Sequence, residues 1–216
     1  MSVVVVTGFG PYAEETDNPS GAIAERLDGR QNGGVTVRGL VLPVTTRGVE
    51  GAIAGALERY RPDALVLTGV APGRTAPALE RVAINVRDFP LPDNGGEEPV
   101  DEPVHAEGPD GYFSTLPIKA IVARWTAEDI PGYVSNTAGT FLCNQAFYTA
   151  RHLTRDTAVA AGFVHIPITP ARAAGIGGRP ESSMPLDVME RAVLLAAVVA
   201  ASHRGDDLCL PAGAIS

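Results

Sequence analysis

Three side chains in this 216-residue sequence have the types required for thiol-based acyl transfer: Cys143, His165 and Glu80. A thiol needs a base that takes its proton, and a histidine base needs an acceptor that fixes its tautomer. Cys143 lies where a loop of small residues gives way to a helical pattern. We therefore expect the helix N-terminus and a nearby imidazole to lower the pKa of the thiol. Free backbone amides at that helix end could also form an oxyanion hole.

Each of the three residues also has an ordinary structural interpretation. Cys143 could be one more buried small hydrophobic residue, and His165 could be a satisfied core histidine within an apolar strand. Glu80 could form a strand-edge ion pair with Arg81. If Cys143 is inert core, iodoacetamide labels it no faster than Cys209, whereas the catalytic hypothesis predicts faster labelling of Cys143. Chain order does not show proximity, so the surrounding elements must bring the set together.

The hydrophobic pattern predicts strands that alternate with helices. We expect strands at 3–7, 35–42, 64–68, 78–85, 133–136 and 158–164, and helices at 22–27, 46–60, 118–127, 142–153 and 185–203. This alternation predicts an α/β sandwich with helices on both faces of the sheet, whose ligands gather at the carboxyl ends of strands. His165 follows such an end, and the 78–85 strand places Glu80 in an apolar neighbourhood. The segment 85–117, rich in Pro, Gly and acidic residues, is predicted to form hairpins or a functional loop.

Length and composition favour one domain over residues 1–216, with a tail from about 205 to 216 that is a candidate for poor order. The formal charge of -8 disfavours nucleic acid and anionic lipid as partners. The sequence begins directly in a predicted strand, so we expect a cytoplasmic protein, and the apolar run 192–201 is too short to span a membrane. The spacing of the four histidines and two cysteines predicts no metal site and no disulfide framework, and we expect no cofactor.

The first loop contains a formal match to the dinucleotide-binding fingerprint, GFGPYA at 8–13. A nucleotide-binding oxidoreductase is therefore a rival function from a different class, and calorimetry with dinucleotides would test it. That fingerprint requires a helix that starts within the loop and presents its amides to pyrophosphate. Here Pro11 and three acidic residues, Glu14, Glu15 and Asp17, occupy the space and would repel phosphate. We therefore favour a structural turn.

Taken together, several segments between residues 5 and 167 resemble the pyroglutamyl peptidase I (pyrrolidone carboxyl peptidase) family of cysteine peptidases. The matching blocks are TGFGPY at 7–12, NPS at 18–20, ERVAIN at 80–85, PDN at 92–94, GYFSTLPIK at 111–119, SNTAGTFLCN at 135–144 and GFVHIP at 162–167. The resemblance fades after Pro170.

The resemblance implies a catalytic triad of Glu80, Cys143 and His165 that removes N-terminal pyroglutamyl residues from peptides through an acyl-enzyme. It implies a single three-layer α/β/α sandwich with a twisted mixed, mostly parallel sheet, and a homotetramer without metal. It also implies a ring-binding pocket, to which we assign Phe9, Tyr12, Asn18, Leu91, Phe141 and Leu142. An uncharged lactam suits aromatic walls with a few backbone hydrogen bonds, and an ordinary charged N-terminus would be excluded.

The sequence departs from the family at Pro90, where members commonly carry an arginine suspected of polarising the scissile carbonyl. Loss of one oxyanion donor typically lowers the rate by ~10²–10³-fold. Arg87, Arg74 or backbone amides are candidate substitutes. An alternative function is therefore a weak or inactive relative that only binds pyroglutamyl peptides. Tyr12, where phenylalanine is usual, adds a hydroxyl that could change the ring preference.

Overall fold

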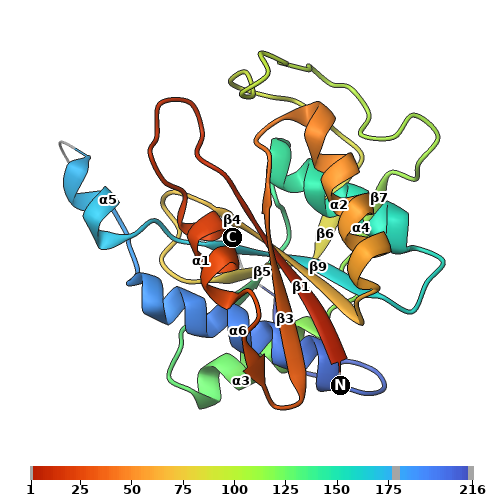
Figure 1. Ribbon diagram of the computed structural model, residues 1–216, viewed down its shortest axis with the longest axis vertical. Coiled ribbons are helices and arrows are strands. Elements are labelled where there is room, and N and C mark those ends of the chain that lie inside the picture. The colour runs from red at the N-terminus through yellow and green to blue at the C-terminus, as the bar shows by residue number, and fades with distance from the viewer. Residues whose placement is uncertain (1, 177–180, 214–216) are drawn as a thin grey trace.

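The computed structural model describes residues 2–176 and 181–213, which form a central sheet covered by helices on both faces (Figure 1). The sheet has seven strands in the order β2-β3-β1-β4-β9-β5-β8. Their bounds are β1 Ser2–Phe9, β2 Gln31–Asn32, β3 Val35–Leu42, β4 Ala64–Val70, β5 Ala78–Glu80, β8 Tyr133–Ser135 and β9 Ala160–Ile166. This is the predicted α/β sandwich with a mixed, mostly parallel sheet.

Strand direction changes twice in the sheet, between the edge strand β2 and β3 and at the β9–β5 pair. The neighbouring strands β3, β1, β4 and β9 are parallel, whereas β5 runs antiparallel to β9 and parallel to the edge strand β8. Two antiparallel neighbours bring the carboxyl end of one strand beside the start of the other. The end of β9, which carries His165, is thereby placed next to the short strand that carries Glu80.

Two apolar cores lie on opposite faces of the sheet, because successive strand residues point to opposite sides. One face is covered by α1 Pro19–Leu27, α3 Ile118–Ala127 and α6 Leu186–Ser202, and its core includes the fully buried Trp125. The other face is covered by α2 Thr46–Tyr60 and α4 Leu142–Thr154. A short helix, α5 Pro170–Gly175, follows β9 and projects from the edge of the sandwich (Figure 1). Helix α4, which carries Cys143, therefore belongs to the face that receives Phe163.

The prediction of one continuous strand over residues 78–85 is wrong. The structure divides it into β5, in the main sheet, and β6 Val82–Ile84, which pairs with β7 Gly111–Phe113 in a separate two-stranded sheet. The break lies at Arg81, whose amide donates to the Ser135 carbonyl and whose carbonyl accepts from the Ser114 amide. An alternating pattern predicts an extended conformation but not which sheet each half joins. The segment 85–117 holds β7 and an isolated antiparallel bridge between Arg87 and Glu102.

The C-terminal tail makes specific contacts as far as residue 212. The Asp207 carboxylate accepts the backbone amides of Lys119 and Ala120 at the start of α3, and the Ala212 carbonyl accepts from Arg81 Nη2. The last residues of the predicted poorly ordered tail, 214–216, lie outside the described residues.

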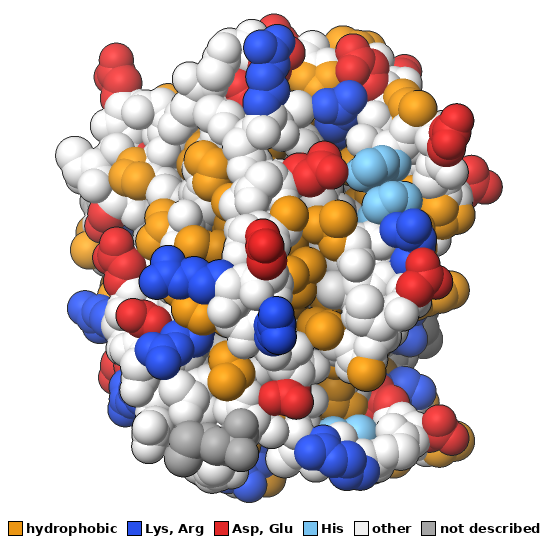
Figure 2. Space-filling view, turned by 45° about the vertical axis from the view of Figure 1, so that its right-hand side comes forward, with side chains coloured by type: hydrophobic (Ala, Val, Ile, Leu, Met, Phe, Trp, Pro, Cys, Tyr) orange, Lys and Arg blue, Asp and Glu red, His pale blue; other side chains and the backbone are white. Residues whose placement is uncertain are grey.

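The surface of the face in Figure 2 intersperses basic and acidic side chains and shows no continuous basic patch on that side. No helix in the described part of the chain is both long and apolar enough to cross a membrane. Among residues 2–176 and 181–213, no cluster of His, Cys, Asp and Glu could hold a metal ion.

Candidate active site

Strand register brings Glu80 and His165 together. In the antiparallel β5–β9 pair, Glu80 lies opposite Phe163 and Ala78 lies opposite His165, so Glu80 and His165 are diagonal neighbours on the same face. His165 Nδ1 lies 2.7 Å from Glu80 Oε1, and both side chains are almost completely buried. An ionised carboxylate can only accept, so Nδ1 donates and Nε2 is left as the free acceptor nitrogen.

The sulfur of Cys143 lies above the neighbouring strand. Gly69 on β4 pairs with His165 on β9, and a Cβ added to Gly69 would lie 2.8 Å from Cys143 Sγ. The thiol therefore occupies the space that the missing side chain leaves, over the residue that pairs with His165 on the adjacent strand. Cys143 is the second residue of α4, and Phe141 gives that helix no side-chain cap. The structure thus gathers the three residues of the candidate catalytic set.

Burial, together with the smaller effect of the Glu80 charge, raises the pKa of the Cys143 thiol to about 12, and the charge of Arg74 offsets part of the rise. The predicted lowering of this pKa by the helix N-terminus and an imidazole is therefore wrong for the free site. Burial also lowers the pKa of His165, and the hydrogen bond to Glu80 offsets part of that shift. The resting site consequently holds a neutral thiol beside a neutral imidazole. Faster iodoacetamide labelling of Cys143 than of the exposed Cys209 is accordingly no longer expected.

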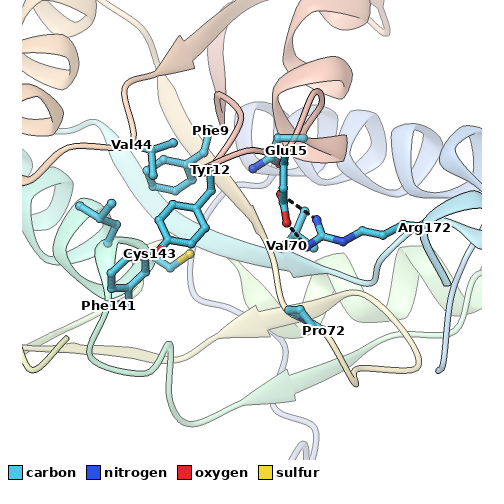
Figure 3. Close-up of a pocket in the computed structure, with 11 residues that line it drawn as sticks. Phe9, Tyr12, Glu15, Val44, Val70, Pro72, Phe141, Cys143 and Arg172 are labelled. Atoms are coloured by element: carbon cyan, nitrogen blue, oxygen red, sulfur yellow. Dashed lines mark hydrogen bonds and ion pairs between the residues drawn. The ribbon is translucent and has the colours of Figure 1, made fainter. Parts of the chain in front are cut away.

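A cavity of about 170 Å³ opens beside the sulfur (Figure 3). Its lining residues are Phe9, Tyr12, Glu15, Asn18, Val44, Val70, Pro72, Phe141, Leu142, Cys143 and Arg172. The Phe141 ring packs edge-on against Tyr12 at 5.9 Å and against Phe89 at 4.5 Å between centroids. The volume is well below the ~300–1,000 Å³ of sites for drug-sized ligands, so the cavity suits a small ring.

The first loop is held over the cavity by the segment 92–94. Asn94 Oδ1 accepts from the Ala13 amide, Asn94 Nδ2 donates to the Pro11 carbonyl, and the Tyr12 hydroxyl donates to the Pro92 carbonyl at 2.8 Å. The Tyr12 hydroxyl therefore serves an interloop hydrogen bond, and the ring forms the cavity wall. This is a physical role for the PDN block that sequence reasoning left unassigned.

Of the six residues predicted for the ring pocket, Phe9, Tyr12, Asn18, Phe141 and Leu142 line the cavity. Leu91 lies outside the lining and is 56% exposed. The Asn18 side chain is engaged within its own loop, because Nδ2 donates to the Gly10 carbonyl and Oδ1 accepts from the Ser20 amide at the start of α1.

Sequence reasoning missed an ion pair that lines the cavity. Arg172 on α5 forms a two-pronged contact with Glu15 from the first loop, and both side chains are about one-third exposed (Figure 3). The signal that could have located α5 is the pair Thr169-Pro170, because the Thr169 side chain caps the helix and proline suits its first turn. Arg172 thereby pairs with Glu15, which carries the only carboxylate among the residues that line the cavity.

The two arginines suggested as substitutes for the family arginine face elsewhere. Arg74 binds Glu80 Oε1 at 2.8 Å, and Arg87 binds Glu102 at 3.0 Å; neither lines the cavity. Pro90 is exposed and also lies outside the lining. Backbone amides remain as candidate donors beside Cys143.

Comparisons with known proteins agree with this geometry. The family model described as pyroglutamyl peptidase matches residues 2–203. The pyrrolidone-carboxylate peptidase of Vibrio campbellii is 46% identical over 215 residues, covering 100% of both chains, and that of Bacillus licheniformis is 40% identical over 205 residues, covering 94% of each.

Solved structures are similar over nearly the whole chain. The pyrrolidone carboxyl peptidase of Thermococcus litoralis has a TM-score of 0.93 at 33% identity and covers 98% of this chain and 100% of its own. Bacillus amyloliquefaciens pyroglutamyl peptidase I has a TM-score of 0.91 at 37% identity, with coverage of 96% and 100%. With a thiol, an imidazole and a carboxylate gathered beside a small aromatic cavity, the chain belongs to the pyroglutamyl peptidase family of cysteine peptidases.

Proposed function

We propose that this enzyme hydrolyses the bond after an N-terminal pyroglutamyl residue of a peptide through a Cys143 acyl-enzyme. The observation that carries the proposal is the buried Glu80–His165 hydrogen bond beside the sulfur that lies over Gly69, at the wall of an aromatic cavity. The names of the relatives support the same activity.

The proposed reaction begins with a neutral thiol. As Cys143 Sγ attacks the pyroglutamyl carbonyl carbon, its proton passes to His165 Nε2, and the carbonyl oxygen gains the negative charge. The uncapped amides at the start of α4 are the proposed donors to that oxygen. When the C–N bond breaks, the imidazolium gives its proton to the departing amine. Water, deprotonated by His165, then hydrolyses the thioester and regenerates the thiol.

Proton transfer coupled to attack follows from the shifted pKa values. Because burial raises the pKa of Cys143 to about 12 and lowers the pKa of His165, a preformed thiolate–imidazolium pair is disfavoured in the free site. Glu80 stabilises the imidazolium that forms transiently, as the acceptor in a triad does.

Specificity for an uncharged ring follows from the cavity lining. The only carboxylate among the lining residues, Glu15, is bound by Arg172, so the charged α-ammonium of an ordinary N-terminus would find no free anionic partner there. A lactam ring carries no charge and can be held by the rings of Phe9, Tyr12 and Phe141.

We also propose, on family grounds, that the enzyme is a cytoplasmic homotetramer. Exposed hydrophobic side chains such as Val100, 66% exposed, and Phe113, 70% exposed, are candidates for burial between subunits. Light scattering on the purified protein measures the oligomeric state directly, and a monomer at micromolar concentration would contradict the proposed tetramer.

The experiment that tests the activity compares a pyroglutamyl-coumarin amide with its prolyl counterpart, using wild type and Cys143→Ser at matched concentration. We expect cleavage of the pyroglutamyl substrate only, with loss of cleavage in the variant. Absence of cleavage by folded wild type, together with saturable binding of a pyroglutamyl peptide, would instead favour the binding protein that Pro90 suggests. The Glu80–His165 hydrogen bond and the position of the Cys143 sulfur over Gly69 support the peptidase.

A further inference from the structure

The partly buried side chain of Arg74, 19% exposed, lies against Glu80 and is not among the residues that line the cavity. Its Nη2 lies 2.8 Å from Glu80 Oε1, the same oxygen that His165 Nδ1 contacts at 2.7 Å. Glu80 is completely buried, and its second oxygen, Oε2, has no hydrogen-bond partner among the described residues. One carboxylate oxygen therefore has two close partners, the imidazole that hydrogen-bonds to it and the permanently charged guanidinium that forms an ion pair with it.

Arg74 also contacts the segment that leads to the nucleophile. Nη2 lies 3.2 Å from the Thr137 carbonyl and 3.4 Å from Ser135 Oγ, and Nη1 lies 3.3 Å from the Tyr133 hydroxyl. Residues 136–141 connect β8 to α4, so the same guanidinium contacts both the carboxylate and the loop before Cys143.

The charge state of Glu80 determines which nitrogen of His165 is protonated. A carboxylate can only accept, so it requires the proton on Nδ1 and leaves Nε2 free to take the thiol proton. A protonated carboxyl group can donate to Nδ1, which would move the imidazole proton to Nε2 and block the base. A fully buried carboxylate beside a neutral imidazole is stable as an anion only where a cation compensates its lost hydration. Arg74 is the cation in contact with it.

We propose that Arg74 is a positioning residue of the triad: it holds Glu80 as a fixed, ionised acceptor, so that His165 keeps its proton on Nδ1 and presents Nε2 to Cys143. This inference rests on the proposed function for its kinetic consequence, but its structural consequence, the tautomer of His165, is independent of turnover.

The first test is the tautomer, measured by long-range ¹H–¹⁵N correlation spectra of protein labelled with [¹⁵N]histidine. The chain has four histidines, and His165→Gln identifies the resonance of interest. We expect the Nδ1–H form in wild type and a gain of the Nε2–H form in Arg74→Gln. An unchanged Nδ1–H signature in the variant would overturn the proposal, even if wild type proves inactive on pyroglutamyl amides.

The second test is a double-mutant cycle with Glu80→Gln, using kcat and KM on the pyroglutamyl amide. If Arg74 acts through Glu80, Arg74→Gln lowers kcat by ~10²-fold with little change in KM, and the double variant is no worse than Glu80→Gln alone. Losses that multiply in the double variant would show that Arg74 acts by another route. Should Arg74→Gln fail to fold, the comparison of the double variant with Glu80→Gln still decides, because neither of these variants leaves an unpaired carboxylate in the core.

Arg81→Gln is the matched control. Arg81 Nε contacts Asn136 Oδ1 at 2.9 Å in the same connecting loop, but the Arg81 side chain makes no contact with Glu80 among the described interactions. We expect its kcat to remain within about threefold of wild type and its His165 tautomer to be unchanged. A loss in Arg81→Gln as large as that in Arg74→Gln would assign the effect to loop anchoring and overturn the proposal.

Discussion

Gly69 lies on β4 beneath the sulfur of Cys143, and its replacement by alanine tests the placement of the nucleophile. An added Cβ would lie 2.8 Å from Cys143 Sγ and 2.9 Å from Phe163 Cζ. Ordinary van der Waals separation begins near 3.4 Å, so both the sulfur and the ring must move away from the added methyl, the sulfur by roughly 0.6–1.2 Å. Phe163 is completely buried, and the sulfur faces the open cavity, so we expect the sulfur to make the larger movement.

A displacement of about 1 Å in a reacting atom can lower the rate by ~10²-fold. We therefore expect kcat of Gly69→Ala on a pyroglutamyl amide to fall by ~10–10²-fold, with overpacking lowering the free energy of unfolding by about 1–3 kcal/mol. Steady-state kinetics and chemical denaturation measure the two quantities on the same preparation.

Gly55→Ala is the matched control for this variant. Gly55 lies within α2, and an added Cβ there meets no atom within 4 Å. We expect unchanged kinetics and a gain of about 0.5–1 kcal/mol in the free energy of unfolding, because alanine is the better helix residue. If Gly69→Ala retains wild-type kcat and stability, the sulfur does not lie over β4 and the proposed attack geometry is refuted.

Three further predictions concern the cavity, Pro90 and pH. Phe141→Ala removes the central ring of the aromatic wall, so KM on the pyroglutamyl amide should rise at least ~10-fold with a smaller change in kcat. An unchanged KM would show that the pyroglutamyl ring of the substrate binds elsewhere. Pro90→Arg should raise kcat by about tenfold if a missing donor limits the rate, and no gain in initial-rate assays would show that the free amides suffice. Burial lowers the pKa of His165, so the unfolded chain binds a proton that the folded chain does not, and the free energy of unfolding should fall as pH drops below about 6.5. Burial raises the pKa of Cys143 to about 12, so the thiol loses its proton in the unfolded chain before it does in the folded chain. The free energy of unfolding should therefore fall again above about pH 9. Urea titrations should show this fall in wild type and not in Cys143→Ala, and the same pH dependence in both proteins would contradict the shift.

Local sequence signals predicted much of the fold because they act over short distances. Helix α2 has the predicted bounds, Thr46–Tyr60, since the apolar spacing is helical and Pro62 prevents continuation. Helix α1 has the predicted end at Leu27 but begins at Pro19, three residues before the predicted start at 22, because the Asn18 side chain caps it and proline suits the first turn. By contrast, the division of 78–85 between two sheets depends on pairing with strands more than 25 residues away in the chain, which an alternating pattern does not encode.

The candidate site shows the same limit. The three residue types were identifiable, but their proximity depends on the β9 register against both β4 and β5. Arg74 was considered only as an oxyanion donor, because its contact with Glu80 follows from the path of the β4–β5 connection and not from spacing in the sequence. The rise in the pKa of Cys143 was missed because burial and the nearby Glu80 charge are tertiary effects.

The central claim is that Cys143 is the nucleophile of a ring-specific site, and affinity labelling tests it most directly. Cys209, exposed in the tail, is the only other cysteine and serves as an internal control. We predict that pyroglutamyl chloromethyl ketone alkylates Cys143 with saturable kinetics and spares Cys209, whereas iodoacetamide reacts faster at Cys209. Equal or non-saturable labelling of both cysteines by the pyroglutamyl reagent, measured by peptide mass spectrometry, would contradict the account.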